Sequence, residues 1–184
     1  MRRLVVLGVA LLTACAPESP DCARLAGGAR YCLQTSEGIV PFEVQQKIDV
    51  AFNSQRETMI AQVEVDAAGM RIAGVTPLGQ RLLQASFADG EIRAEGIALE
   101  KLDPALLLAL IQLASWNADR VRSGLGGSAE LVETEEGRSV VKDGKAVLRI
   151  GYTRGRPPTG DVEIGLPGMS VEFRIVTLDE GDIE

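Results

Sequence analysis

Histidine is absent from the 184-residue chain, and this absence narrows its chemistry more than any other feature. Without histidine there is no Ser-His-Asp or Cys-His nucleophile, and the commonest general base near neutral pH is missing. Zinc sites that use imidazole ligands are excluded for the same reason. We therefore expect no metal and no cofactor, and the sequence favours a protein that is not an enzyme.

Long apolar runs and basic charge are also scarce. The N-terminal run Leu4 to Leu12 would rise only about 14 Å as a helix, which is too short for a bilayer core of roughly 30 Å. The chain has 19 basic and 26 acidic side chains. If Arg2 and Arg3 are removed with a signal peptide, the formal charge changes from −7 to −9. Such a surface repels phosphate, so we expect no nucleic acid partner and no attraction to anionic headgroups.

The N-terminus has the features of a bacterial lipoprotein. Met1-Arg2-Arg3 precedes the apolar run, which ends in Leu12-Thr13-Ala14-Cys15. This order resembles a lipobox, so residues 1–14 are predicted to be a removed signal peptide and Cys15 the lipidated residue. Two or three acyl chains, palmitate among them, would hold the protein at a membrane. The alternative is a soluble secreted protein with an incidental cysteine.

The residues after Cys15 suggest a location. Ala16 stands where lipoprotein sorting rules place the aspartate that retains a protein at the inner membrane, so we expect the periplasmic face of a Gram-negative outer membrane. Because that compartment is oxidising, Cys22 and Cys32 are predicted to pair, with free or metal-bound thiols as the alternative. We assign residues 15–33 to a lipidated tether and disulfide loop, and residues 34–184 to the folded domain.

Apolar and polar residues alternate with period two along most of the chain from Lys47 onward. This alternation is typical of half-buried strands, and Asp89-Gly90 and Asp143-Gly144 are strong hairpin signals between them. We count eight to eleven short strands. The expected fold is mainly β, a single antiparallel sheet that forms an unclosed or strongly curved β-barrel.

One strong helix is predicted between the two groups of strands. Asp103 is a good N-cap, Pro104 suits the first helical position, and the apolar run Ala105 to Trp116 follows. The helix is apolar on nearly every side and must therefore be covered on several sides. It is either a plug that fills the barrel or a lid over an apolar cavity, and the segment Asn117 to Gly127 after it resembles a loop. Candidate lid residues are Leu106, Leu110, Leu113 and Trp116.

Three short stretches resemble functional motifs only superficially. Gly168 to Glu172 fails the G-x-S-x-G pattern at its last position, and it precedes a strand rather than a helix. Gly124 to Ser128 lacks the lysine of a phosphate-binding loop and is better explained as a flexible connection. Glu133 to Gly137 is predicted to be the solvated end of a hairpin.

The turn Thr76-Pro77-Leu78-Gly79 carries a leucine at its tip between two expected strands. This turn, the lipidated N-terminus, the curved sheet and the apolar helix together resemble the LolB family of outer-membrane lipoproteins and its periplasmic relative LolA. The closest resemblance is to LolB-like lipoproteins linked to aryl-polyene-type lipid synthesis. It covers roughly residues 47–178 and implies an apolar cavity for acyl chains. In that family the leucine of the turn helps deliver lipid to the membrane, a role that the resemblance transfers to Leu78.

Three functional hypotheses follow. The first is a membrane-anchored binder of an acyl chain or lipid-like cargo, supplied by a LolA-like periplasmic carrier, with Leu78 facing the membrane. The second is a structural or assembly lipoprotein whose barrel is filled and whose surface binds a protein partner. The third is a hydrolase with a pair of carboxylates, although no spacing in the sequence distinguishes such a pair.

Overall fold

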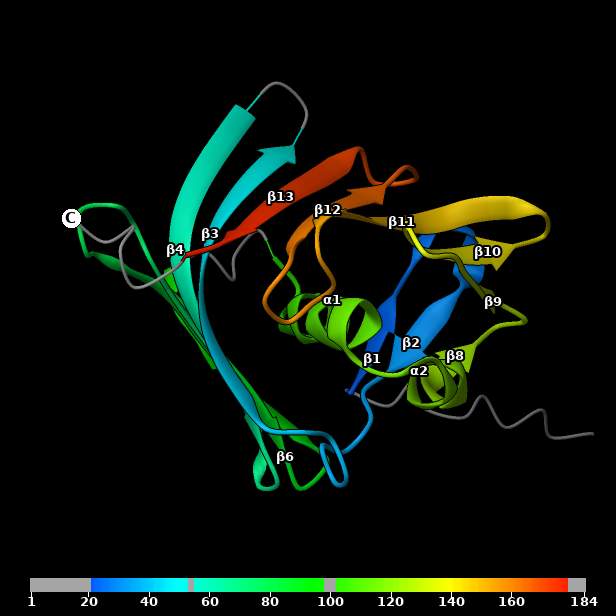
Figure 1. Ribbon diagram of the computed structural model, residues 1–184, viewed down its shortest axis with the longest axis horizontal. Helices are drawn as coiled ribbons and strands as arrows, with labels where there is room; N and C mark the ends of the chain where they lie inside the picture. The colour runs from blue at the N-terminus through cyan, green and yellow to red at the C-terminus, as the bar shows by residue number, and fades with distance from the viewer. Residues whose placement is uncertain (1–20, 53–54, 98–101, 179–184) are drawn as a thin grey trace, which may run out of the picture.

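The computed structural model describes residues 21–52, 55–97 and 102–178, in which the chain is mainly β with two α-helices (Figure 1). The elements of the first half are β1 (Cys22–Arg24), the 3₁₀ turn η1 (Ala26–Gly28), β2 (Arg30–Cys32), β3 (Phe42–Phe52), β4 (Gln55–Asp66), β5 (Gly69–Val75), β6 (Arg81–Ala88) and β7 (Glu91–Glu95). Those of the second half are α1 (Pro104–Ser115), α2 (Ala118–Gly124), β8 (Leu125–Gly126), β9 (Glu130–Glu133), β10 (Gly137–Lys142), β11 (Lys145–Arg154), β12 (Asp161–Leu166) and β13 (Val171–Thr177).

Ten strands form one large antiparallel sheet with the order β7-β6-β5-β4-β3-β13-β12-β11-β10-β9. The pairing of β13 with β3 joins the strands that precede the helices to those that follow them. The sheet is not closed, because β7 and β9 form its two edges. In Figure 1 it bends around α1, which lies on its concave side.

The period-two alternation of the sequence corresponds to the two faces of this sheet. In β4 the buried side chains are Met59, Ala61, Val63 and Val65, and the residues between them are less buried. Successive side chains of a strand point to opposite faces, so one face of β4 packs into the core. The expectation of a mainly β, antiparallel fold is thus confirmed.

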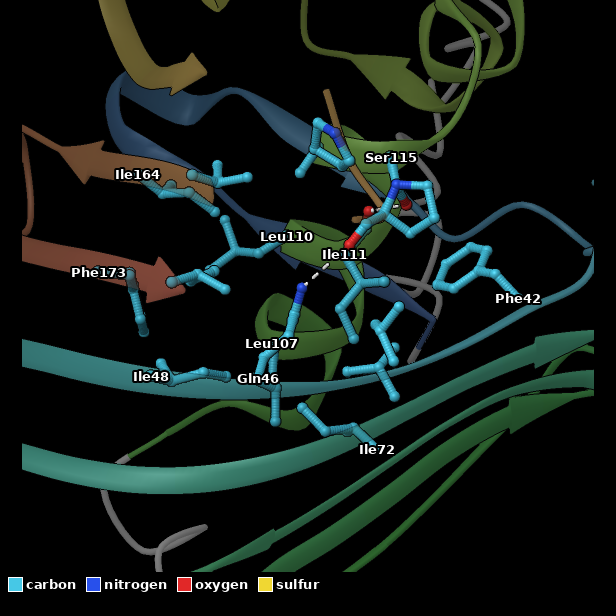
Figure 2. Close-up of a pocket in the computed structure, with 17 residues that line it drawn as sticks. Phe42, Gln46, Ile48, Ile72, Leu107, Leu110, Ile111, Ser115, Ile164 and Phe173 are labelled. Atoms are coloured by element: carbon cyan, nitrogen blue, oxygen red, sulfur yellow. Dashed lines mark hydrogen bonds between the residues drawn. The ribbon is translucent and has the colours of Figure 1, made fainter. Parts of the chain in front are cut away.

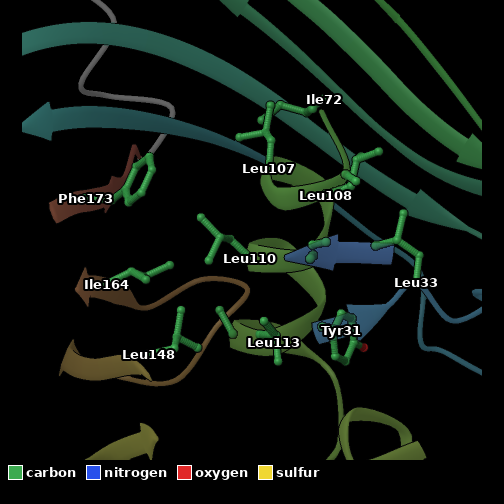
Figure 3. Close-up of a cluster of buried hydrophobic side chains, with 14 of the residues drawn as sticks. Tyr31, Leu33, Ile72, Leu107, Leu108, Leu110, Leu113, Leu148, Ile164 and Phe173 are labelled. Atoms are coloured by element: carbon green, nitrogen blue, oxygen red, sulfur yellow. The ribbon is translucent and has the colours of Figure 1, made fainter. Parts of the chain in front are cut away.

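α1 is enclosed on two sides, which explains its apolar composition. Figure 3 shows Ile164 of the large sheet on one side of the helix and Tyr31 and Leu33 of the N-terminal segment on the other. Leu108 and Leu113 of α1 are fully buried between these layers. A helix that is apolar on every side requires such double cover.

The N-terminal cover of α1 is a small sheet of three strands in the order β1-β2-β8. Its strands β1 and β2, called the N-terminal ribbon below, lie within residues 22–32, which we expected to form only a disulfide loop ahead of the domain. Ala23 and Tyr31 of this ribbon are fully buried, so it is part of the core.

The segment Asn117 to Gly127 is not the loop expected from its sequence. It forms α2 and β8, and the side chain of Asn117 caps α2 by accepting a hydrogen bond from the Arg120 amide at 3.0 Å. Gly124 ends this helix directly against β2, where an added Cβ would lie 2.6 Å from the carbonyl oxygen of Cys32. The glycine therefore permits a close approach of α2 to the N-terminal ribbon.

Candidate functional site

A cavity of about 990 Å³, called the large cavity below, lies between the large sheet and the start of α1. Apolar side chains form most of its wall: Val50, Phe52, Met59, Leu82, Ile97, Leu102, Leu106, Met169, Val171 and Phe173. Phe52 and Ile97 are 49% and 70% exposed, so the cavity reaches the surface. Its volume is at the upper end of the range of about 300–1,000 Å³ for small-molecule sites.

The large cavity lies at one end of the large sheet. Phe52 pairs with both Gln55 of β4 and Val171 of β13, which places the end of β3 beside the starts of β4 and β13. The β5–β6 turn points the same way, because β5 runs antiparallel to β4 and ends at Val75, opposite Ile60. Leu78 in this turn therefore lies toward the same end of the sheet as the large cavity, although it does not line the cavity.

A few polar side chains interrupt the apolar wall of the large cavity: Arg24, Gln55, Glu57, Thr58 and Asp103. The Thr58 hydroxyl donates a hydrogen bond to Asp49 at 2.6 Å, and this bond is the main cause that lowers the pKa of Asp49. Asp103 accepts a hydrogen bond from the Ala105 amide at 2.9 Å and thereby caps α1. These groups provide polar contacts around an otherwise apolar chamber.

A second cavity, called the small cavity below, measures about 50 Å³ and lies further along α1. In Figure 2 Leu107, Leu110 and Ile111 of α1 approach it from one side, and Phe42 and Phe173 lie at opposite ends of the group. Its polar groups already have partners in the protein. The Gln46 side-chain amide donates to the Pro158 carbonyl at 3.4 Å, and the Ser115 hydroxyl donates to the Ile111 carbonyl at 2.6 Å.

The four candidate residues of α1 fall into two groups. Leu106 lines the large cavity and Leu110 lines the small one. Leu113 and Trp116 line neither, and they are 0% and 1% exposed. Their expected contact with lipid stays a prediction, and in this structure both side chains are packed in the core instead.

The remaining candidate residues lie away from the cavity walls. Leu78 is 90% exposed at the tip of a turn closed by hydrogen bonds from the Gly79 amide to the Thr76 carbonyl and from the Thr76 amide to the Gln80 carbonyl, each 2.8 Å long. Cys22 and Cys32 form the expected disulfide, which joins β1 to β2. Cys15 and the predicted signal peptide lie outside the described residues.

The side chain of Gln112 ties α1 to the N-terminal ribbon. Its carbonyl oxygen accepts hydrogen bonds from the Tyr31 hydroxyl at 3.0 Å and the Gln34 amide at 2.9 Å. Its amide nitrogen donates to the Gln34 carbonyl at 2.8 Å. Burial raises the pKa of Tyr31 above its usual range, so the hydroxyl stays protonated as the donor. α1 is held by polar as well as apolar contacts.

An ion pair between the buried Arg138 and the partly buried Glu133 fixes the other end of α1 and was not anticipated from the sequence. The Arg138 guanidinium lies 2.8 Å from the Glu133 carboxylate and donates to the carbonyls of Leu113 and Trp116. A cation satisfies the free carbonyls at a helix C-terminus. Glu133 was expected at a solvated hairpin end, but the hairpin of β9 and β10 turns it toward Arg138. Arg156 lies 3.3 Å from the same carboxylate.

No helix among residues 21–52, 55–97 and 102–178 is long and apolar enough to cross a membrane. The same ranges contain no group of three or more Cys, Asp or Glu side chains placed to hold a metal ion.

Comparison with known families gives one match. Residues 43–179 match the family described as "Protein of unknown function (DUF3261)". The chain belongs to the DUF3261 family. The DUF3261 match begins in β3 and extends past β13, so it includes all of the large sheet except the first residue of β3, and both helices, but not β1 and β2. No curated protein matches this DUF3261 chain.

Proposed function

We propose that this protein is a membrane-anchored, non-enzymatic binder of an acyl chain or a similar lipid, which enters the large cavity. The observation that carries the proposal is the cavity itself, about 990 Å³ in volume and walled mainly by aliphatic and aromatic side chains. An alkyl chain that moves from water into such a space gains hydrophobic free energy, and it leaves no buried polar group without a hydrogen bond.

The proposal extends to the LolB-like character of the fold. A ten-stranded open sheet bent around α1 is compatible with an unclosed barrel, and the exposure of Leu78 supports the membrane contact proposed for it. In this view α1 is the plug of the barrel along its C-terminal half. Its first turn, with Leu106, borders the space for cargo.

The proposed cellular setting follows from the N-terminus. Cys15 carries the lipid anchor, the domain faces the periplasm from the outer membrane, and a LolA-like carrier supplies the cargo. Leu78 and the cavity opening lie at the same end of the sheet, so cargo that leaves the cavity passes close to the residue proposed to contact the bilayer.

The proposal that the protein is not an enzyme rests on its acidic residues as well as on the lack of histidine. Glu57 and Asp103 both line the large cavity. Asp103 already serves α1 as the N-cap and accepts the amide of Ala105. A carboxylate with this structural role is poorly placed to act as one of a catalytic pair.

Binding can be tested with a secreted, soluble form that begins after Cys15. Native mass spectrometry should detect a copurified lipid, and fatty acids should displace a fluorescent analogue. Leu106→Asp, which places a charge in the cavity wall, should abolish displacement. Val132→Asp is the control, because Val132 is 47% exposed on β9 and lines neither cavity. A ligand-free protein that displaces nothing would support the filled structural lipoprotein instead.

A further inference from the structure

Among the described residues, the walls of the large and small cavities share a single side chain, Phe173 of β13. On the same face of β13, Val171 lies two residues before Phe173 and lines the large cavity. Ile175 lies two residues after Phe173 and lines the small cavity. Phe173 is 5% exposed, so its ring occupies the interior between them.

The strands on either side of β13 show the same division. Phe173 pairs with Val50 of β3, which lines the large cavity, and with Ile164 of β12, which lines the small cavity. On α1, Leu106 borders the large cavity and Leu110, one turn further on, borders the small one. The boundary between the two spaces therefore crosses the molecule at Phe173.

The chemistry of the two spaces differs in a way that orients a ligand. The polar atoms of Gln46 and Ser115 in the small cavity donate hydrogen bonds to protein carbonyls, so that space suits a hydrocarbon end. The wall of the large cavity also includes Arg24 and Gln55, and Gln55 pairs with the exposed Phe52, so this space suits a polar headgroup in contact with water.

We propose that the large cavity holds a single unbranched alkyl chain, that the small cavity is its closed continuation, and that Phe173, which separates the two, stops the chain and sets its maximum length. This inference rests on the proposed lipid-binding function. In the wild-type protein the methyl end of the chain stops against the Phe173 ring, inside the large cavity. Removal of the ring frees a space on the order of a benzene molecule and joins the two cavities.

The test uses the full chain in phospholipid nanodiscs and a series of saturated fatty acids from octanoate to eicosanoate. For wild type, affinity should increase with chain length and then level off at the stop. For Phe173→Leu and Phe173→Ala, the increase should continue to longer chains, by about fourfold for each additional buried methylene. Phe173→Trp should level off at a shorter chain.

Photolabelling locates the end of the chain directly. Fatty acids with a diazirine at the methyl end should label Val50 and Met169 in wild type, and Val44 and Pro158 of the small cavity in Phe173→Ala. Phe87→Ala is the matched control, since Phe87 is also buried, at 3% exposure, but lines neither cavity.

The outcomes separate the two proposals. If wild-type protein does not bind the fatty acids and no residue of either cavity is photolabelled, the lipid-binding function itself is wrong. If wild type binds fatty acids but labels Val44 or Pro158 without any substitution, Phe173 is not a stop. An unchanged length profile in folded Phe173→Leu protein would also overturn the inference.

Discussion

Arg138 is the most deeply buried charged side chain among the described residues, so its partner Glu133 should matter for stability. Arg138 is 7% exposed, and without Glu133 its buried charge would keep only the neutral carbonyls of Leu113 and Trp116 as partners. We expect Glu133→Gln to lower the free energy of unfolding by about 3 kcal/mol at neutral pH, measured by urea denaturation. Glu135→Gln, an exposed change in the same hairpin, should stay within about 0.5 kcal/mol of wild type.

The same carboxylate should give stability a pH dependence. Burial acts to raise the pKa of Glu133, but hydrogen bonds and positive charge from Arg138 and Arg156 outweigh it and hold the pKa below its ordinary value. A carboxyl group whose pKa is lower in the folded than in the unfolded protein stabilises the fold at pH values above its unfolded-state pKa of about 4.3. This stabilisation is lost as the pH falls through the lower, folded-state pKa. The difference between wild type and Glu133→Gln should therefore shrink below about pH 4. A constant difference in urea titrations down to pH 3 would contradict this.

Leu78 should matter for lipid delivery and hardly at all for folding. Its side chain is 90% exposed, so Leu78→Glu should change stability by no more than about 0.5 kcal/mol. A charge at the tip of the turn should nevertheless prevent insertion into a bilayer, and transfer of bound fatty acid to vesicles should slow sharply. Val40→Glu is the control, since Val40 is also exposed, at 82%, but lies before β3. Equal slowing in both variants would remove the special role of Leu78.

At the scale of elements, the ribbon of β1 and β2 depends on its disulfide. The bond between Cys22 and Cys32 closes a loop with a sequence separation of 10. Loss of such a crosslink should destabilise the protein by about 2.5–3 kcal/mol on the chain-entropy model. Calorimetry should show the same lowered melting temperature for Cys22→Ser/Cys32→Ser as for reduced wild type. Reductant should not change the melting temperature of the double variant.

The elements that local chemistry specifies could be predicted from the sequence. α1 starts at Pro104 behind the cap Asp103, as expected, and the hairpins at Asp89-Gly90 and Asp143-Gly144 have the positive φ angles that such turns require. The strands of two or three residues were missed. β1, β2 and β8 are too short to show a period, and β8 is a strand only because it pairs with β2, which lies far from it in the sequence.

The site was less predictable than the fold, because it depends on curvature and on which elements cover α1. A helix that is apolar all round gives no sign of which face is open, so Leu106 and Leu113 looked equivalent in the sequence. The ribbon that encloses Leu113 and Trp116 was not predicted as structure. Phe173 likewise looked like an ordinary strand residue, and only the positions of β3 and β12 beside it place it between two cavities.

At the scale of the whole molecule, anchoring should be separable from binding. We expect wild-type protein to incorporate labelled palmitate and to sediment with outer membranes. Cys15→Ser should lose the label. Ala16→Asp should keep the label but shift the protein to inner-membrane fractions, because it introduces the aspartate of the sorting rule. Palmitate in Cys15→Ser protein would show that the anchor lies elsewhere.

Ligand binding should stabilise the entire domain, since the cavity wall includes strands from both halves of the large sheet. A ligand that binds only the folded state, at a free concentration a hundred times its dissociation constant, raises the free energy of unfolding by about 2.7 kcal/mol. For a chain of this length, that corresponds to an increase in melting temperature of about 5–10 °C. Differential scanning fluorimetry of the soluble form with a fatty acid should show this increase, and Leu106→Asp should abolish it. If the melting temperature is instead indifferent to fatty acids and sensitive to a protein from the same envelope, the acidic surface rather than the cavity is the functional part.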